Sequence, residues 1–164
     1  MKYTDWNPRK NDINVTVKKA YEDMQKYVTA TNQKEIPLMV QFFENPRFKN
    51  YRGNLFKGST TLKQHDILHI LLNKDMSMQG EAYTIGFSMG STKKNSKIEI
   101  WLFLTIIKYF YPKQFRFGKN DVEIFKKGFI DGSQVNIQNI EILNYEKLFF
   151  MNLYEAREQL KILK

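Results

Sequence analysis

The sequence predicts an all-α fold, a single-domain bundle of about seven helices. Apolar residues recur every three or four positions along most of the chain, and no stretch shows the alternation of a half-buried strand. Proline and glycine separate one element at a time, and neither an internal repeat nor a linker is visible. A chain of 164 residues is long enough to bury one core, so we expect one domain over residues 1–164.

The N-terminal part predicts two helices and a loop. Apolar residues at helical spacing after a polar start indicate a first helix from Asp12 to Thr31. Pro37 fits the first turn of a helix, so "PLMVQFFEN" is expected to form a short helix that stops before Pro46. Residues 46–59 show no helical period and contain two glycines, which favours a surface loop. The apolar positions of the first helix are Val17, Tyr21, Met24 and Val28.

The next helix is predicted to carry both histidines of the chain. Thr61 and Gln64 form a capping box that starts it, and residues 73–76 make the turn that follows it. The helix is anchored by Leu62, Leu68, Leu71 and Leu72.

A further helix is expected after that turn. Ser77 is a suitable N-cap, and the helix runs to about Thr92. Glu81 then lies in its first turns, and an antiparallel hairpin would carry this side chain back beside the histidine helix. Gly86 and Gly90 allow another helix or a flat ring to approach closely, and helix packing is the more common use of such glycines.

The C-terminal half predicts three more helices. "IEIWLFLTIIKYFYP", from Ile98 to Pro112, is too short and too interrupted by charge for a membrane span, so we expect a buried central helix. Asp121 is expected to cap a helix with Val122, Phe125 and Phe129 on one face. The last helix has Phe149, Leu153, Ala156 and Leu160 as its apolar positions.

The composition limits both chemistry and location. The chain has no cysteine, so any metal must be held by nitrogen and oxygen. "MKYTDWNPRKND" contains acids and no apolar core, unlike a signal or transit peptide, and we expect a cytoplasmic protein. The net charge of +9 fits a nucleic acid, an anionic membrane or a lysine-rich background. Because no nucleic-acid module is recognisable, we expect no nucleic-acid partner.

The spacing of the two histidines suggests a metal site. On a helix, His65 and His69 lie about 40° apart, and Asp66 lies about 60° from His69. If the hairpin brings Glu81 beside them, two imidazoles and two carboxylates converge, and such a set suits zinc, iron or another divalent first-row ion. The alternative is that the histidines decorate a solvated helix face. Spacing alone does not decide between these two interpretations.

The motif His65-Asp66-x-x-His69, followed by eleven residues and Glu81, resembles the signature of the Coq-four family of ubiquinone (coenzyme Q) biosynthesis proteins. The resemblance implies that these four residues bind a divalent metal, for which zinc is the usual description. The family is all-helical, in agreement with the periodicity of this sequence. A cofactor of divalent zinc, with iron or another first-row metal as the alternative, is therefore expected.

The resemblance also implies a function. It predicts a prenyl-lipid-associated protein that supports or carries out removal of the ring carboxylate and hydroxylation of a prenylated quinone precursor, and it favours an enzyme. It implies other quinone-biosynthesis enzymes as partners and peripheral contact with the inner face of the membrane. Glu81 and Asp66 are the candidate catalytic groups, as bases near the cation, and Asp66 could instead orient an imidazole. We also consider a homodimer.

The lipid and the reaction leave alternatives open. Trp101, Phe103 and Ile107 could line an apolar groove for a prenyl tail, although core packing is the more common use of such residues. "YPKQFRFGK" mixes basic and aromatic residues as at an anionic lipid interface, and a solvated loop fits it equally well. A non-catalytic lipid-binding scaffold with a structural metal has the same sequence features. A zinc hydrolase is less favoured because Asp66 is one methylene shorter than the glutamate of H-E-x-x-H enzymes.

Overall fold

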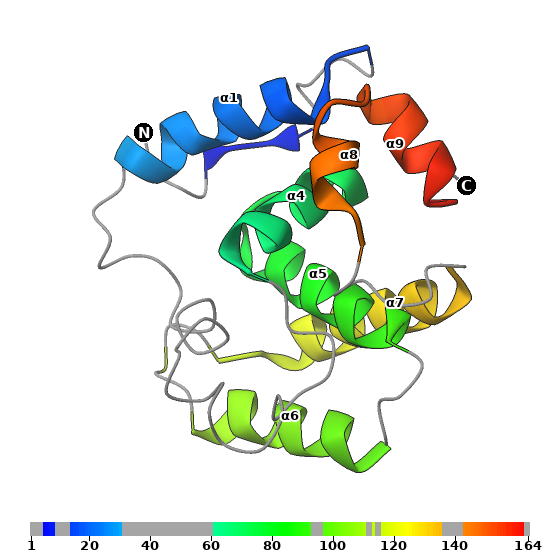
Figure 1. Ribbon diagram of the computed structural model, residues 1–164. Coiled ribbons are helices and arrows are strands. Elements are labelled where there is room, and N and C mark those ends of the chain that lie inside the picture. Colours follow the sequence, from blue (N-terminus) through cyan, green and yellow to red (C-terminus); the bar gives the residue numbers. More distant parts are fainter. Residues whose placement is uncertain are drawn as a thin grey trace.

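The computed structural model describes residues 5–8, 14–30, 61–92, 97–110, 113, 116–135 and 143–162. All named elements in these ranges are α-helices, which confirms the all-α prediction, and Figure 1 shows their arrangement. The predicted helix at 37–45 and the predicted loop at 46–59 lie outside the described residues. The helices are α1 (Val17–Ala30), α4 (Leu62–Leu72), α5 (Met78–Ser91), α6 (Lys97–Tyr109), α7 (Lys119–Gln134), α8 (Tyr145–Phe149) and α9 (Leu153–Gln159).

Two apolar cores lie on either side of α5. The first core joins α1, α4, α8 and α9, and Phe87 of α5 reaches into it. The second joins α5, α6 and α7, with Phe125 of α7 fully buried between Phe103 and Phe117. Figure 1 shows α5 at the centre, with α1, α8 and α9 above it and α6 below. The helix that carries Glu81 is therefore enclosed from both sides.

The start of α1 is tied to the C-terminal part of the chain. The Thr16 hydroxyl accepts the N–H of Lys19, which ends the non-helical segment before α1. The N–H of Val17 donates to the Met151 carbonyl, and the N–H of Leu153 donates to the Val15 carbonyl, both at 2.9 Å. The prediction that the helix already includes residues 14–16 is wrong, because Thr16 pairs with Asn152 and the Val15 carbonyl accepts the Leu153 N–H instead.

Two further boundaries differ from the prediction. The N-cap of α7 is Gly118, and Asp121 occupies the third helical position, from which its carboxylate accepts the Gly118 N–H at 2.8 Å. The expected single C-terminal helix is divided into α8 and α9. Asn144 and Asn152 cap these two helices by accepting N–H groups of their first turns. A second asparagine cap therefore starts a new helix where the periodicity indicated continuity.

Glycines bring α5 and α7 into backbone contact. A Cβ atom at Gly86 or Gly90 would collide with a backbone carbonyl of α7, and one at Gly128 or Gly132 would collide with a backbone carbonyl of α5. Each helix thus presents a glycine pair, four residues apart, to the other. The predicted close helix packing at Gly86 and Gly90 is confirmed. This packing lets α5 be covered by a neighbouring helix at very short range.

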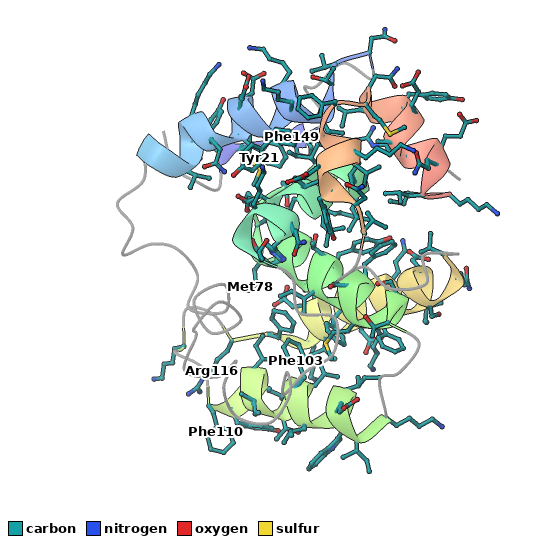
Figure 2. All side chains as sticks on the ribbon, viewed as in Figure 1. Tyr21, Met78, Phe103, Phe110, Arg116 and Phe149 are labelled. Carbon is teal, nitrogen blue, oxygen red and sulfur yellow. The ribbon has the colours of Figure 1, made fainter. Side chains whose placement is uncertain are left out.

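The expectation of a buried central helix over the aromatic segment is wrong. Phe103 and Ile107 of α6 are buried, but Trp101 is 66% exposed and Phe110, just after the helix, is 78% exposed. Figure 2 shows Phe103 directed inward and Phe110 directed away from the molecule. A helix that is apolar on all sides is usually interior, whereas here the interior position is taken by α5. No helix among the described residues is long and apolar enough to cross a membrane.

Candidate metal centre

The histidine helix α4 is fixed at both ends. At its start, the Thr61 hydroxyl accepts the Gln64 N–H, and the Gln64 side chain accepts the Thr61 N–H at 2.8 Å, so the predicted capping box is confirmed. At its end, the Arg157 guanidinium of α9 donates to the carbonyls of Ile70 and Leu71 at 2.9 and 3.0 Å. The guanidinium is half-buried, and this burial lowers its pKa. Its hydrogen bonds satisfy carbonyl groups that have no partner within the helix at a helix end.

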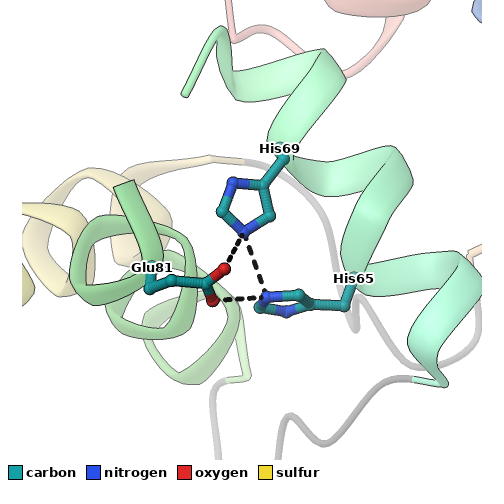
Figure 3. A group of neighbouring side chains, drawn as sticks. All are labelled: His65, His69 and Glu81. Atoms are coloured by element: carbon teal, nitrogen blue, oxygen red, sulfur yellow. Dashed lines mark hydrogen bonds and ion pairs between the residues drawn. The ribbon is translucent and has the colours of Figure 1, made fainter. Parts of the chain in front are cut away.

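A short turn connects α4 to the first turn of α5. Asn73 closes α4 in the left-handed conformation at a φ of 54°, which asparagine tolerates better than most residues. Ser77 caps α5, as predicted: its hydroxyl accepts the Gly80 N–H, and its carbonyl accepts the Glu81 N–H at 2.9 Å. In Figure 3, α4 runs across the view while α5 is seen nearly end-on, so the two helices are steeply inclined to each other and the predicted antiparallel hairpin is not formed. Glu81 still lies beside the histidines, because it is in the first turn of α5, close to the connection with α4.

Three side chains from these two helices meet at one point (Figure 3). The Nε2 atoms of His65 and His69 lie 3.1 Å apart. The Glu81 carboxylate lies 3.0 Å from His65 Nε2 through one oxygen and 3.5 Å from His69 Nε2 through the other. The solvated-face alternative for the histidines is therefore wrong, because His69 and Glu81 are buried and His65 is mostly covered.

Charge at this point is set by Glu81. Burial disfavours the carboxylate and by itself would raise its pKa, but the imidazoles of His69 and His65 more than offset this effect. The pKa of Glu81 is consequently held well below its usual range. The group is an ionised carboxylate in a nearly dry environment, and it requires positive charge beside it.

The orientation of His69 is fixed by a backbone group. Its Nδ1 atom lies 3.0 Å from the carbonyl oxygen of Asp75, and only a protonated Nδ1 can donate to that oxygen. The neutral tautomer that makes this bond carries its free lone pair on Nε2, which faces His65 and Glu81. The pattern of a backbone carbonyl holding the remote nitrogen is common for metal-ligating histidines.

The separations of the three donors fit a single metal ion. Ligand atoms on one tetrahedral zinc are about 3.3 Å apart, given zinc–ligand bonds of about 2.0–2.1 Å. The observed separations are 3.0, 3.1 and 3.5 Å. Lone pairs that face one another at this distance repel unless a proton or cation lies between them. The three residues could therefore hold one divalent ion, with a fourth coordination position left for water or a substrate.

The structure does not bring Asp66 into this group. Asp66 is buried on α4, but its carboxylate accepts a hydrogen bond of 3.0 Å from the Gln25 side chain of α1. The pKa of Tyr21 is raised mainly by burial of its hydroxyl and also by the charge of the Asp66 carboxylate. Asp66 thus faces α1, because its position one residue after His65 turns it by about 100° around the helix. Of the four expected ligands, three converge.

The residues expected to line a lipid groove do not share a surface. Phe103 and Ile107 pack into the core between α5, α6 and α7, whereas Trp101 lies on the outer face of α6. Sequence reasoning also missed two residues at the centre, Asp75 and Gly80. The sequence signal nearest to them is Asp75-x-Ser77, which lies in the turn between the two predicted helices. The partner of His69 is the backbone carbonyl of Asp75, and because every residue has such a group, the residue type could not reveal it.

Comparisons with known proteins identify no family for this chain. The chain matches no protein-family model, and searches of curated proteins and solved structures found no significant match.

Added zinc should stabilise the wild-type chain through the three converging residues. At a free zinc concentration of about 100 times Kd, binding to the native state alone raises Tm by roughly 5–10 °C for a chain of this size. Thermal unfolding with and without zinc should show this rise in wild type and lose it in His69→Ala and Glu81→Gln.

Asp66→Asn is the informative control for this measurement. An asparagine can still accept the hydrogen bond from Gln25, and Asp66 lies outside the cluster, so the zinc-dependent rise should persist. A rise that disappears in Asp66→Asn would mean that Asp66 is a ligand and that the three-residue centre is incomplete.

Proposed function

We propose that this chain is a divalent-metal protein whose His65–His69–Glu81 centre binds the polar ring of a prenylated quinone precursor. The observation that carries the metal part is the convergence of three donors at separations typical of one ion. The ring and its prenyl tail are supported by the likeness of the His65-Asp66-x-x-His69 and Glu81 motif to ubiquinone-biosynthesis proteins. The open coordination position is the place where a ring carboxylate would bind.

The donor set restricts what each metal could do. Two imidazoles, one carboxylate and an open position are typical of catalytic zinc sites and also of non-haem iron oxygenases. Zinc has no redox chemistry, so a zinc-loaded chain would bind and polarise the ring carboxylate. Replacing that carboxylate by hydroxyl is an oxidation that needs an oxidant. With zinc, the chain would therefore support a partner enzyme, whereas an iron ion held by the same three residues would supply redox chemistry, with molecular oxygen as the oxidant.

The roles of the two carboxylates follow from their surroundings. The low pKa of Glu81 makes it a good ligand and a weak base at neutral pH. Asp66 lies outside the cluster and accepts a hydrogen bond from Gln25 of α1, which disfavours direct proton transfer at the metal. A hydrolase that needs a base beside metal-bound water is therefore less supported than a ring-binding centre. A structural metal in a lipid-binding scaffold predicts the same three ligands but no exchangeable fourth one.

Peripheral membrane contact has separate support on α6. The outer face of this helix exposes large apolar residues, and exposed Lys97, Lys108 and Lys113 lie on or near it. Apolar and aromatic side chains flanked by lysines are typical of helices that lie in an anionic lipid interface. Membrane contact would bring the chain to its prenylated substrate. The exposed apolar residues are Ile98, Trp101, Leu102, Tyr109 and Phe110.

Ring binding is tested by titrating metal-loaded protein with a prenylated hydroxybenzoate in detergent. We expect saturable binding to wild type that requires metal and is lost in Glu81→Gln. The matched control is Glu155→Gln, the same change at an exposed position of α9, which should bind as wild type does. Binding of equal strength to metal-free protein would contradict the proposal. If the ring displaces a water from the metal, the metal has an exchangeable ligand, which the scaffold with a structural metal does not predict.

Membrane contact is tested by co-sedimentation with vesicles of neutral or partly anionic lipid. Wild type should bind the anionic vesicles, with binding that weakens at high salt. The double variant Trp101→Ser and Phe110→Ser should lose most of this binding because it removes the largest apolar groups from the interface. Tyr154→Ser, at an exposed aromatic of α9, is the control and should bind normally. Equal binding of both variants would exclude α6 as the contact.

A further inference from the structure

We propose that Asp75, Ser77 and Gly80 act as positioning residues that fix His69 and Glu81 for the metal. This inference rests on the proposed metal site and names residues outside its ligand set that determine its affinity. The three residues lie in the turn between α4 and α5 and in the first turn of α5. None of them would touch the metal, and each acts through a hydrogen bond or a close backbone contact.

The link to His69 is the carbonyl oxygen of Asp75. This oxygen accepts the Nδ1–H of His69 at 3.0 Å and so selects both the ring direction and the tautomer. Because the acceptor is a backbone atom, its position depends on the path of the turn. Any change that moves the turn away from α4 would release the imidazole.

The turn packs closely against α5 because Gly80 has no side chain. A Cβ atom at this position would collide with the same Asp75 carbonyl oxygen and would lie 2.7 Å from Asp75 Oδ1. Only glycine lets the first turn of α5 press against the acceptor of His69. Glu81 is the next residue, so this contact also sets the distance between the carboxylate and the imidazoles.

The side chains of Asp75 and Ser77 hold the turn in this shape. The Asp75 carboxylate accepts the N–H of Ser77 at 3.2 Å and its hydroxyl at 2.6 Å. The Ser77 hydroxyl accepts the Gly80 N–H at 3.2 Å. A continuous series of contacts therefore runs from His69 through Asp75 and Ser77 to the backbone beside Glu81. Loss of such a supporting contact typically weakens metal affinity by about 10–100-fold.

Cobalt is the probe for this proposal, because its visible absorption reports both binding and coordination geometry. We expect Gly80→Ala to weaken Co²⁺ affinity at least tenfold and to shift the absorption bands. The matched control is Gly132→Ala, whose Cβ would collide with the Phe87 carbonyl in the α5–α7 contact. It should lower Tm while leaving Co²⁺ affinity within about twofold and the bands unchanged.

A second pair of variants decides the matter if Gly80→Ala does not fold. Asp75→Ala removes the carboxylate that holds the turn, and Asp75→Asn keeps an oxygen that accepts both Ser77 hydrogen bonds. Asp75→Ala should lose Co²⁺ affinity at least tenfold, and Asp75→Asn should restore it. In the metal-free protein, ¹H–¹⁵N spectra of the two histidines should show His69 protonated at Nδ1 in wild type and in Asp75→Asn.

The outcomes separate this inference from the proposed function. A wild-type chain that binds no Co²⁺ would overturn the metal site and this inference with it. Wild-type binding together with unchanged affinity and bands in Gly80→Ala or in Asp75→Ala would overturn the positioning role alone. Equal losses in Gly80→Ala and Gly132→Ala would also overturn it, because the effect would then follow general destabilisation of α5.

Discussion

A carboxylate buried inside the molecule is the constraint on which the candidate centre depends. Glu81 lies in the first turn of α5, and burial penalises its charge. If both imidazoles are neutral, neither balances the charge of the carboxylate, whose oxygens lie 3.0 and 3.5 Å from their Nε2 atoms. One divalent cation at this point would compensate the charge and accept all three donors. Electrostatics and geometry thus lead to the same interpretation of the cluster.

Small residues make this arrangement possible because they let α5 be enclosed at short range. Gly80 admits the Asp75 carbonyl at the start of the helix, and Gly86 and Gly90 admit the backbone of α7 further along. An enclosed α5 holds Glu81 away from water, which strengthens its interaction with any cation. The outer helix α6 covers the second core with one face and leaves an apolar face exposed. The protein therefore separates an interior polar centre from an exterior apolar surface.

Local signals in the sequence predicted much of this structure. The Thr61 capping box and the Ser77 cap have specific side-chain chemistry, and both helix starts are where they were predicted. His65, His69 and Glu81 could be predicted because helical spacing and a short turn restrict where they lie. The partner of Asp66 could not be predicted, because its position on α4 allowed it to face either the histidines or a neighbouring helix. The hydrogen bond from Gln25 of α1 decides for the neighbouring helix.

Tertiary packing accounts for the predictions that failed. Trp101, Phe103 and Ile107 are alike in hydrophobicity, so the sequence could not show which face of α6 would meet the core. The burial of α5 was equally hidden, because its glycines, serines and threonines have low hydrophobicity and gain burial from backbone contact. The break between α8 and α9 depends on pairing with the segment before α1, which lies far away in sequence.

The most direct test of the metal centre is elemental analysis of the chain purified without added metal, beside His65→Gln and Glu81→Gln. The proposed metal centre predicts about one equivalent of a divalent metal per wild-type chain and its loss in both variants. Wild-type protein that contains no metal and takes up none on titration with zinc or iron would contradict the account. The cluster would then be a buried, proton-bridged network, and the ring-binding function would lose its support.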